Sequence, residues 1–175
     1  ARGMPAPKKI PTNFNEILQY VWWTVDKSLY HEMIEASALA CAIECAKNGV
    51  TFVIDHHASP FHIKGSLEVI AKAFDRVGLS HLLCVELSDR DGEKAAADHL
   101  EETRSYLASG RNGLVGLHAS FTVGDKLLAA AVALARETAS GLHVHVAEGP
   151  DDQVHCERTY GKRIIPRFRD AGVLD

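Results

Sequence analysis

The feature that most constrains the fold is a repeated alternation of short apolar segments with longer amphipathic ones. The short segments are continuous runs of aliphatic and β-branched residues, which is typical of strands buried on both faces. Each is followed by a segment with helical spacing of its apolar residues, in a unit of about 30 residues. We therefore predict an α/β fold with four parallel strands, near 50–55, 81–87, 113–118 and 142–147.

Capping residues set the expected limits of the helices. Asn13 and Asp26 are N-cap residue types, so one helix is expected to begin at each of them. Gly141 is expected to close the fifth helix, and Pro166 to interrupt or kink the sixth. The expected helices are 13–23, 26–47, 66–77, 92–108, 124–139 and 151–170.

The chain length limits the architectures that fit this pattern. A complete (β/α)8 barrel needs about 250 residues, and this chain has 175. Four strands therefore fit either an open doubly wound sheet or roughly half of such a barrel. Half a barrel has two open sheet edges and an exposed inner face, which favours self-association. We expect a homo-oligomer.

Composition excludes several classes of protein. The net charge of −4 and the pI near 6.2 lack the basic footprint of a nucleic-acid binder. No apolar run approaches the roughly 18 residues of a membrane span. Four scattered cysteines do not form a secreted disulfide framework, and the first residues show no signal peptide. We expect a cytoplasmic protein that acts on a small molecule, with no nucleic-acid or membrane partner.

Histidines and carboxylates gather where the four expected strands end, and parallel α/β proteins place their functional sites at these ends. Core packing does not explain polar groups at all four ends, whereas a shared pocket does. The polar ends are Asp55, His56 and His57 for the first strand, Glu86 and Asp89 for the second, His118 for the third, and His143, His145 and Glu148 for the fourth.

The fourth strand carries the pattern H-x-H-x-x-E. His143 and His145 are two residues apart, so on a strand they share one face and can approach one divalent metal ion. Glu148 follows in the expected loop, where it could act as a general base on a metal-bound water. The structural alternative is that His143 fills the interior and His145 hydrogen-bonds a neighbour.

The segment 141–148, followed by 160–163, resembles the amidohydrolase superfamily, and most closely the branch of cytosine and guanine deaminases and triazine chlorohydrolases. Residues 117–122 resemble the fourth-strand motif of that branch. Residues 55–60 resemble a subgroup of aminohydrolases associated with selenium metabolism. The resemblance extends over essentially the whole chain, and H-x-H-x-x-E is its most specific part.

This resemblance implies a (β/α)8 barrel that uses metal-activated water on a non-peptide C–N bond of a cyclic amidine or nucleobase-like substrate. Hydrolysis of a C–Cl bond is the rarer variant. The family supplies one divalent metal, zinc or iron. His145 matches its metal ligand on strand five, Glu148 its catalytic acid/base and His118 a substrate-binding histidine. Asp55, His56, His57 and His143 are further candidates for the pocket.

The match covers only strands two to five of the family barrel. The family's first two ligands, in an H-x-H pattern, would precede Ala1, and its last histidine and aspartate ligands would follow Asp175. We therefore interpret 1–175 as the central segment of a metal-dependent hydrolase barrel, inactive in isolation. With one family ligand, the segment is expected to bind zinc weakly.

Two alternatives remain open. The sequence Asp55-His56-His57 after an apolar strand also resembles the signature of DHH phosphoesterases, but these enzymes need further aspartates upstream. Asp26 is the only aspartate before Asp55, and it is interpreted as a helix cap. The second alternative is a non-catalytic α/β binding domain, in which the histidines at the strand ends are incidental.

Overall fold

The computed structural model describes residues 6–7 and 9–175, and its strands confirm the parallel α/β prediction. Strands β1 and β2 form one parallel pair, and β3 and β4 form another. Isolated parallel bridges, Leu83 to Gly113 and Leu87 to Leu117, connect the pairs, so the strands lie side by side in chain order. Their bounds are β1 (Phe52–His57), β2 (Ser80–Val85), β3 (Val115–Ala119) and β4 (Leu142–His145).

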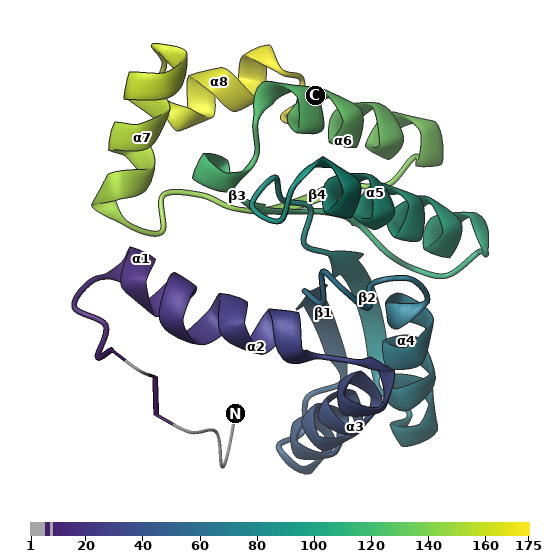
Figure 1. Cartoon of the computed structure of the whole chain (residues 1–175). Coiled ribbons are helices and arrows are strands. Elements are labelled where there is room, and N and C mark those ends of the chain that lie inside the picture. Colours follow the sequence, from purple (N-terminus) through teal and green to yellow (C-terminus); the bar gives the residue numbers. More distant parts are fainter. Residues whose placement is uncertain (1–5, 8) are drawn as a thin grey trace.

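Helices follow each strand, as the alternation predicts. Figure 1 shows α3 and α4 with β1 and β2 in the lower half of the molecule, and α5 to α8 with β3 and β4 in the upper half. The elements are α1 (Phe14–Ile17), the π-helical turn η1 (Leu18–Trp22), α2 (Trp23–Ser28), α3 (His31–Lys47), α4 (Ser66–Val77), α5 (Glu93–Ala108), the 3-10 turn η2 (Ser120–Thr122), α6 (Asp125–Thr138), α7 (Pro150–Tyr160) and α8 (Ile164–Asp170).

The first helical segment begins as predicted but ends later. Asn13 caps α1, because its side chain accepts a hydrogen bond from the Glu16 backbone N–H at 2.9 Å. The expectation that Asp26 caps the next helix is wrong. Asp26 lies inside α2, which ends at Ser28. The backbone is extended at Leu29, and α3 begins at His31. The Asp26 carboxylate instead contacts Arg90, a partner far along the chain.

The ends of two later helices also differ from expectation. The last helical segment breaks at Gly161, which has a φ of +65°, and not at Pro166. Pro166 lies in the first turn of α8, where its missing N–H removes no helical hydrogen bond. Helix α6 is closed by Ala139 in the left-handed region, two residues before the expected glycine.

Two apolar cores lie between the strands and the outer helices. One contains Leu67, Phe74 and Leu83, and the other contains Leu117 and Phe168. On the other face of β1, in contrast, Phe52 and Ile54 are each 50% exposed. β1 is therefore packed on its helical side and open on the other side, whereas β3 is buried along its whole length. Among the described residues, no helix combines the length and apolarity needed to cross a membrane.

Gly116 is required where β2 and β3 approach each other. A Cβ atom at this position would lie 2.3 Å from the Val85 carbonyl oxygen, which is too close for any side chain. This close approach keeps the second and third strand ends next to each other.

Candidate functional site

A cavity of about 570 Å³ lies at the carboxyl ends of the strands. All four strand ends contribute to its lining, and the α1–α2 segment supplies aromatic and acidic side chains. Apolar rings and titratable groups therefore face one space. The main lining residues are Phe14, Trp22, Trp23, Asp26, Asp55, His56, His57, Glu86, Arg90, His118, His145 and Glu148.

Three histidines cluster at this end of the sheet. Ligand atoms of His56, His143 and His145 all lie within 4.8 Å of one another. The His56 ring stacks on the His145 ring, with centroids 4.6 Å apart, and its centroid lies 4.7 Å from that of His143. His143 and His145 come from one strand, and His56 comes from the opposite end of the strand order.

The environment of the cluster favours the neutral form of two of its histidines. Burial, followed by the neighbouring histidines, lowers the pKa of His56 to about 2, and burial also lowers the pKa of His143. The His145 Nδ1 atom lies 3.0 Å from the His118 carbonyl oxygen, to which it can only donate. This hydrogen bond leaves the Nε2 lone pair of His145 free, which is the arrangement found in metal-binding histidines.

His118 lines the cavity from the end of β3. Its Nδ1 atom lies 2.7 Å from the Thr122 hydroxyl oxygen, and its ring centroid lies 6.4 Å from that of Trp23. Burial, followed by the positive charge of Arg90, lowers its pKa to about 3. A neutral His118 can therefore exchange hydrogen bonds with a molecule in the cavity.

Glu148 is exposed and borders the same cavity. The preceding residue, Ala147, has a φ of +57°, a conformation that L-residues rarely adopt. Asp152, which is 3% exposed, accepts a hydrogen bond from the Ala147 N–H at 2.8 Å and another from the Ser120 hydroxyl. Asp152 thus connects the loop that carries Glu148 to the loop that follows β3.

Asp55 and His57 border the cavity but do not join the histidine cluster. Neighbouring residues on a strand point to opposite faces, so both are directed away from His56. His57 is buried, with its Nε2 atom 2.8 Å from the Ser59 hydroxyl oxygen, and burial lowers its pKa to about 4. Burial raises the pKa of Asp55 to about 6. Burial, followed by the neighbouring Cys45 and then by Asp55, also raises the pKa of Cys41 on α3.

The sequence analysis missed a buried ionic cluster around Arg90, whose side chain is 6% exposed. The guanidinium contacts Asp26 at 2.7 Å, Glu86 at 2.5 Å and Asp91 at 3.0 Å, and it lies over the Trp23 ring. Burial raises the pKa of Glu86 to about 8, against the opposing effect of Arg90. In the sequence, the only indication of this ionic cluster was the group of polar residues that follows β2.

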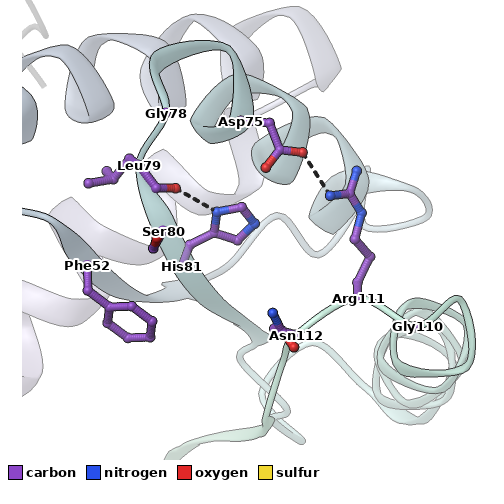
Figure 2. A pocket seen from close by; sticks show the side chains of 9 residues that line it. All are labelled: Phe52, Asp75, Gly78, Leu79, Ser80, His81, Gly110, Arg111 and Asn112. Atoms are coloured by element: carbon purple, nitrogen blue, oxygen red, sulfur yellow. Dashed lines mark hydrogen bonds and ion pairs between the residues drawn. The ribbon is translucent and has the colours of Figure 1, made fainter.

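A second cavity, of about 560 Å³, lies at the amino ends of the strands (Figure 2). Here Arg111 pairs with Asp75 at 2.8 Å and also contacts Glu68. His81 Nδ1 hydrogen-bonds the Leu79 carbonyl at 3.0 Å. These contacts connect α4 to the chain before β3, which suits a structural role.

The chain belongs to the amidohydrolase family, whose model matches residues 11–172. It is 30% identical to a 5-methylthioadenosine/S-adenosylhomocysteine deaminase from Thermococcus sibiricus, over 91% of this chain and 38% of that protein. It is 26% identical to a 5'-deoxyadenosine deaminase from Methanopyrus kandleri, over 87% and 35%. The chain thus spans little more than a third of the length of these relatives.

Solved structures agree on the fold. An adenosine deaminase from Xanthomonas campestris with bound zinc superposes with a TM-score of 0.74 at 20% identity, over 91% of this chain and 36% of that one. A triazine hydrolase from Arthrobacter aurescens gives a TM-score of 0.72 at 17% identity, over 87% and 37%. The family resemblance predicted from the sequence is confirmed.

Proposed function

We propose that this chain is the central segment of a metal-dependent aminohydrolase with a (β/α)8 barrel. The observation that carries the proposal is the meeting of three groups at one cavity: His145 and Glu148 from the end of β4 and His118 from the end of β3. The parallel strands in chain order, each followed by a helix, fit a segment of such a barrel.

The residues present fit a divalent metal. His145 is oriented by the His118 carbonyl, and the ring nitrogens of His56 are buried without hydrogen-bond partners. We therefore assign His145 as a ligand of one zinc or iron ion. Bound metal would supply Lewis-acid activation of the attacking water.

Glu148 serves as the acid/base in this proposal. Its carboxylate is exposed to the cavity and lies on a loop fixed by Asp152, so it can accept a proton from water. The same carboxyl can then deliver that proton to the leaving nitrogen. His118 contacts the substrate through the ring nitrogen that does not face Thr122.

The proposed substrate is a small, flat, nitrogen-rich ring such as a nucleobase-like amidine. Aromatic side chains on the α1–α2 segment line one wall of the cavity, and Glu86 and Arg90 offer hydrogen-bonding groups. The named activities of the relatives, deamination of adenosine-type compounds and hydrolysis of triazines, support a ring of this kind. A C–Cl bond remains the variant reaction.

As part of the same proposal, we place the protein in the cytoplasm and expect the 175-residue segment to self-associate through the exposed inner face of β1. The DHH phosphoesterase alternative has no support, because Asp55 and His57 point away from His56 and the matched family is a different one. The alternative of a non-catalytic binding domain does not explain why Glu148 borders the cavity beside His145.

The test compares Glu148→Gln with His145→Ala in an intact protein that carries the complete barrel. Glu148→Gln removes the base but keeps the shape, so kcat should fall by roughly 10²–10⁴-fold with metal content unchanged. His145→Ala should lower the metal content itself. Glu157→Gln, an exposed change on α7, is the matched control. Near-full turnover in Glu148→Gln would refute the acid/base assignment.

A further inference from the structure

We propose that Asp152 on α7 and Arg167 on α8 are positioning residues for the two loops that carry the proposed site groups. They hold Glu148, after β4, and His118, at the end of β3, in fixed places relative to each other. The inference rests on the proposed function for the roles of Glu148 and His118. Neither Asp152 nor Arg167 borders the cavity, so both act through the backbone that carries these groups.

The carboxylate of Asp152 connects the two loops directly. Asp152 is almost fully buried, at 3% exposed. One carboxylate oxygen accepts a hydrogen bond from the Ser120 hydroxyl, in the turn that follows β3. The other accepts a hydrogen bond from the Ala147 N–H at 2.8 Å, in the loop that follows β4. Because hydrogen bonds to an ionised acceptor are strong, this carboxylate fixes the separation of the two loops.

Arg167 holds the backbone of the turn after β3. Its buried guanidinium donates from Nη1 to the Ser120 carbonyl at 3.0 Å and from Nη2 to the Val123 carbonyl at 2.7 Å. Its Nε donates to the Asp125 carboxylate at 2.9 Å, at the start of α6. The guanidinium also lies 3.6 Å above the centre of the Tyr160 ring. All three guanidinium nitrogens therefore have partners, which offsets the cost of burying this charge.

Ser120 is the residue at which the two sets of contacts meet. Asp152 binds its hydroxyl and Arg167 binds its carbonyl, and Ser120 itself has no exposed surface. The same short turn contains Thr122, whose hydroxyl oxygen lies 2.7 Å from His118 Nδ1. A shift of this turn would therefore move the hydrogen-bond partner that orients the His118 ring.

The loop after β4 gives a second reason to assign a positioning role. Ala147 has a φ of +57°, a conformation that is unfavourable for a residue with a side chain and persists only where its surroundings enforce it. The hydrogen bond from its N–H to the buried Asp152 provides such a constraint. Since Glu148 is the next residue, the conformation of Ala147 sets the direction in which the chain carries Glu148 to the cavity.

Hydrogen–deuterium exchange of the intact protein that carries the complete barrel tests these positions without a substrate. Asp152→Ala removes the acceptor of the Ala147 N–H, so exchange in segment 146–149 should become roughly tenfold faster or more. Arg167→Met should also speed exchange in this segment, because it releases Ser120 and through it the Asp152 carboxylate. Arg169→Met, an exposed change on the same helix, is the matched control and should leave exchange unchanged.

Kinetics test the consequence for the proposed reaction, with ammonia release from adenine, guanine, cytosine and melamine as the assay. Asp152→Ala should lower kcat by up to about 100-fold, since a displacement of about 1 Å at the reacting groups can cost this much. Asp152→Asn should restore most of kcat, because its amide oxygen can still accept the Ala147 N–H. Arg167→Met should raise KM more than it lowers kcat, because it releases the turn that orients His118. A role in stability alone would leave KM unchanged.

Circular dichroism reports whether each variant folds. Ser120→Ala removes only the hydroxyl that connects the loops, so it replaces any variant that does not fold and should also speed exchange in segment 146–149. Unchanged exchange there in folded Arg167→Met and Ser120→Ala would overturn the proposal, as would wild-type kinetics in Asp152→Ala. The exchange results decide the positioning role even when none of the four rings is a substrate. Failure of the proposed function is distinguishable, because Glu148→Gln would then keep wild-type turnover.

Discussion

The two ends of the strands carry cavities of nearly equal volume but opposite chemistry. At the carboxyl ends, histidines with lowered pKa values and a buried arginine with two of its carboxylate partners face about 570 Å³. At the amino ends, about 560 Å³ is bordered by ion pairs that reach the surface and by His81, which is hydrogen-bonded to the Leu79 carbonyl. Cavity size therefore does not distinguish the two ends, whereas lowered histidine pKa values and the unpaired ring nitrogens of His56 mark the carboxyl ends as the candidate site.

The largest expected contrast is between the two arginines. Arg90→Met should destabilise the fold by about 3–5 kcal/mol, because it leaves buried carboxylates without a counter-charge. Arg111→Met should cost only about 0–1 kcal/mol, because its partners are solvated. Urea denaturation of both variants measures the difference. Equal losses in the free energy of unfolding would show that the burial of Arg90 does not make its ion pairs more important for stability than those of Arg111.

Acid should weaken the carboxyl-end site. His56, His57 and His118 have folded pKa values of about 2, 4 and 3, below the ordinary 6.5 of the unfolded chain. Their contribution to stability is therefore present above pH 6.5 and is lost as the pH falls toward these values. By pH 5 the loss is about 2 kcal/mol per histidine.

Glu86 opposes this loss of stability in acid. Its folded pKa of about 8 lies above the unfolded value, so its penalty to folding disappears as the pH falls. The net loss between pH 7 and pH 5 is thus smaller than the histidine sum, and Glu86→Gln should make it steeper. Thermal unfolding at several pH values measures both. A stability that is flat over this range in Glu86→Gln would contradict the buried, neutral histidines.

The smallest contrast concerns two alanines with positive φ, one at each end of the strands. Ala139 closes α6 with a φ of +52°, and Ala147 precedes Glu148 with a φ of +57°. Glycine relieves backbone strain at such positions. Ala139→Gly and Ala147→Gly should therefore each raise the free energy of unfolding by up to about 1 kcal/mol. Only Ala147→Gly should also reduce turnover of the intact enzyme, because it loosens the loop that carries Glu148. Equal turnover in both variants would mean that the loop conformation does not position Glu148.

The strands could be predicted because their apolar runs are local and continuous. The H-x-H-x-x-E spacing likewise predicted His145 and Glu148 as candidate site residues, because residues on one strand have fixed relative directions. The role of Asp26 could not be predicted, because local capping preference competed with Arg90, which is distant in sequence. The contact between His56 and His145 also depends on the curvature of the sheet, which no local pattern encodes.

His118 contributes to the site through two chemically separate groups. Its ring borders the cavity, while its backbone carbonyl receives the hydrogen bond from His145. Every amino acid has that carbonyl, so substitution at position 118 changes the ring without removing the acceptor. In the proposed enzyme, residue 118 can therefore vary during evolution while the orientation of His145 is retained. Mutational scanning at this position measures the side chain alone.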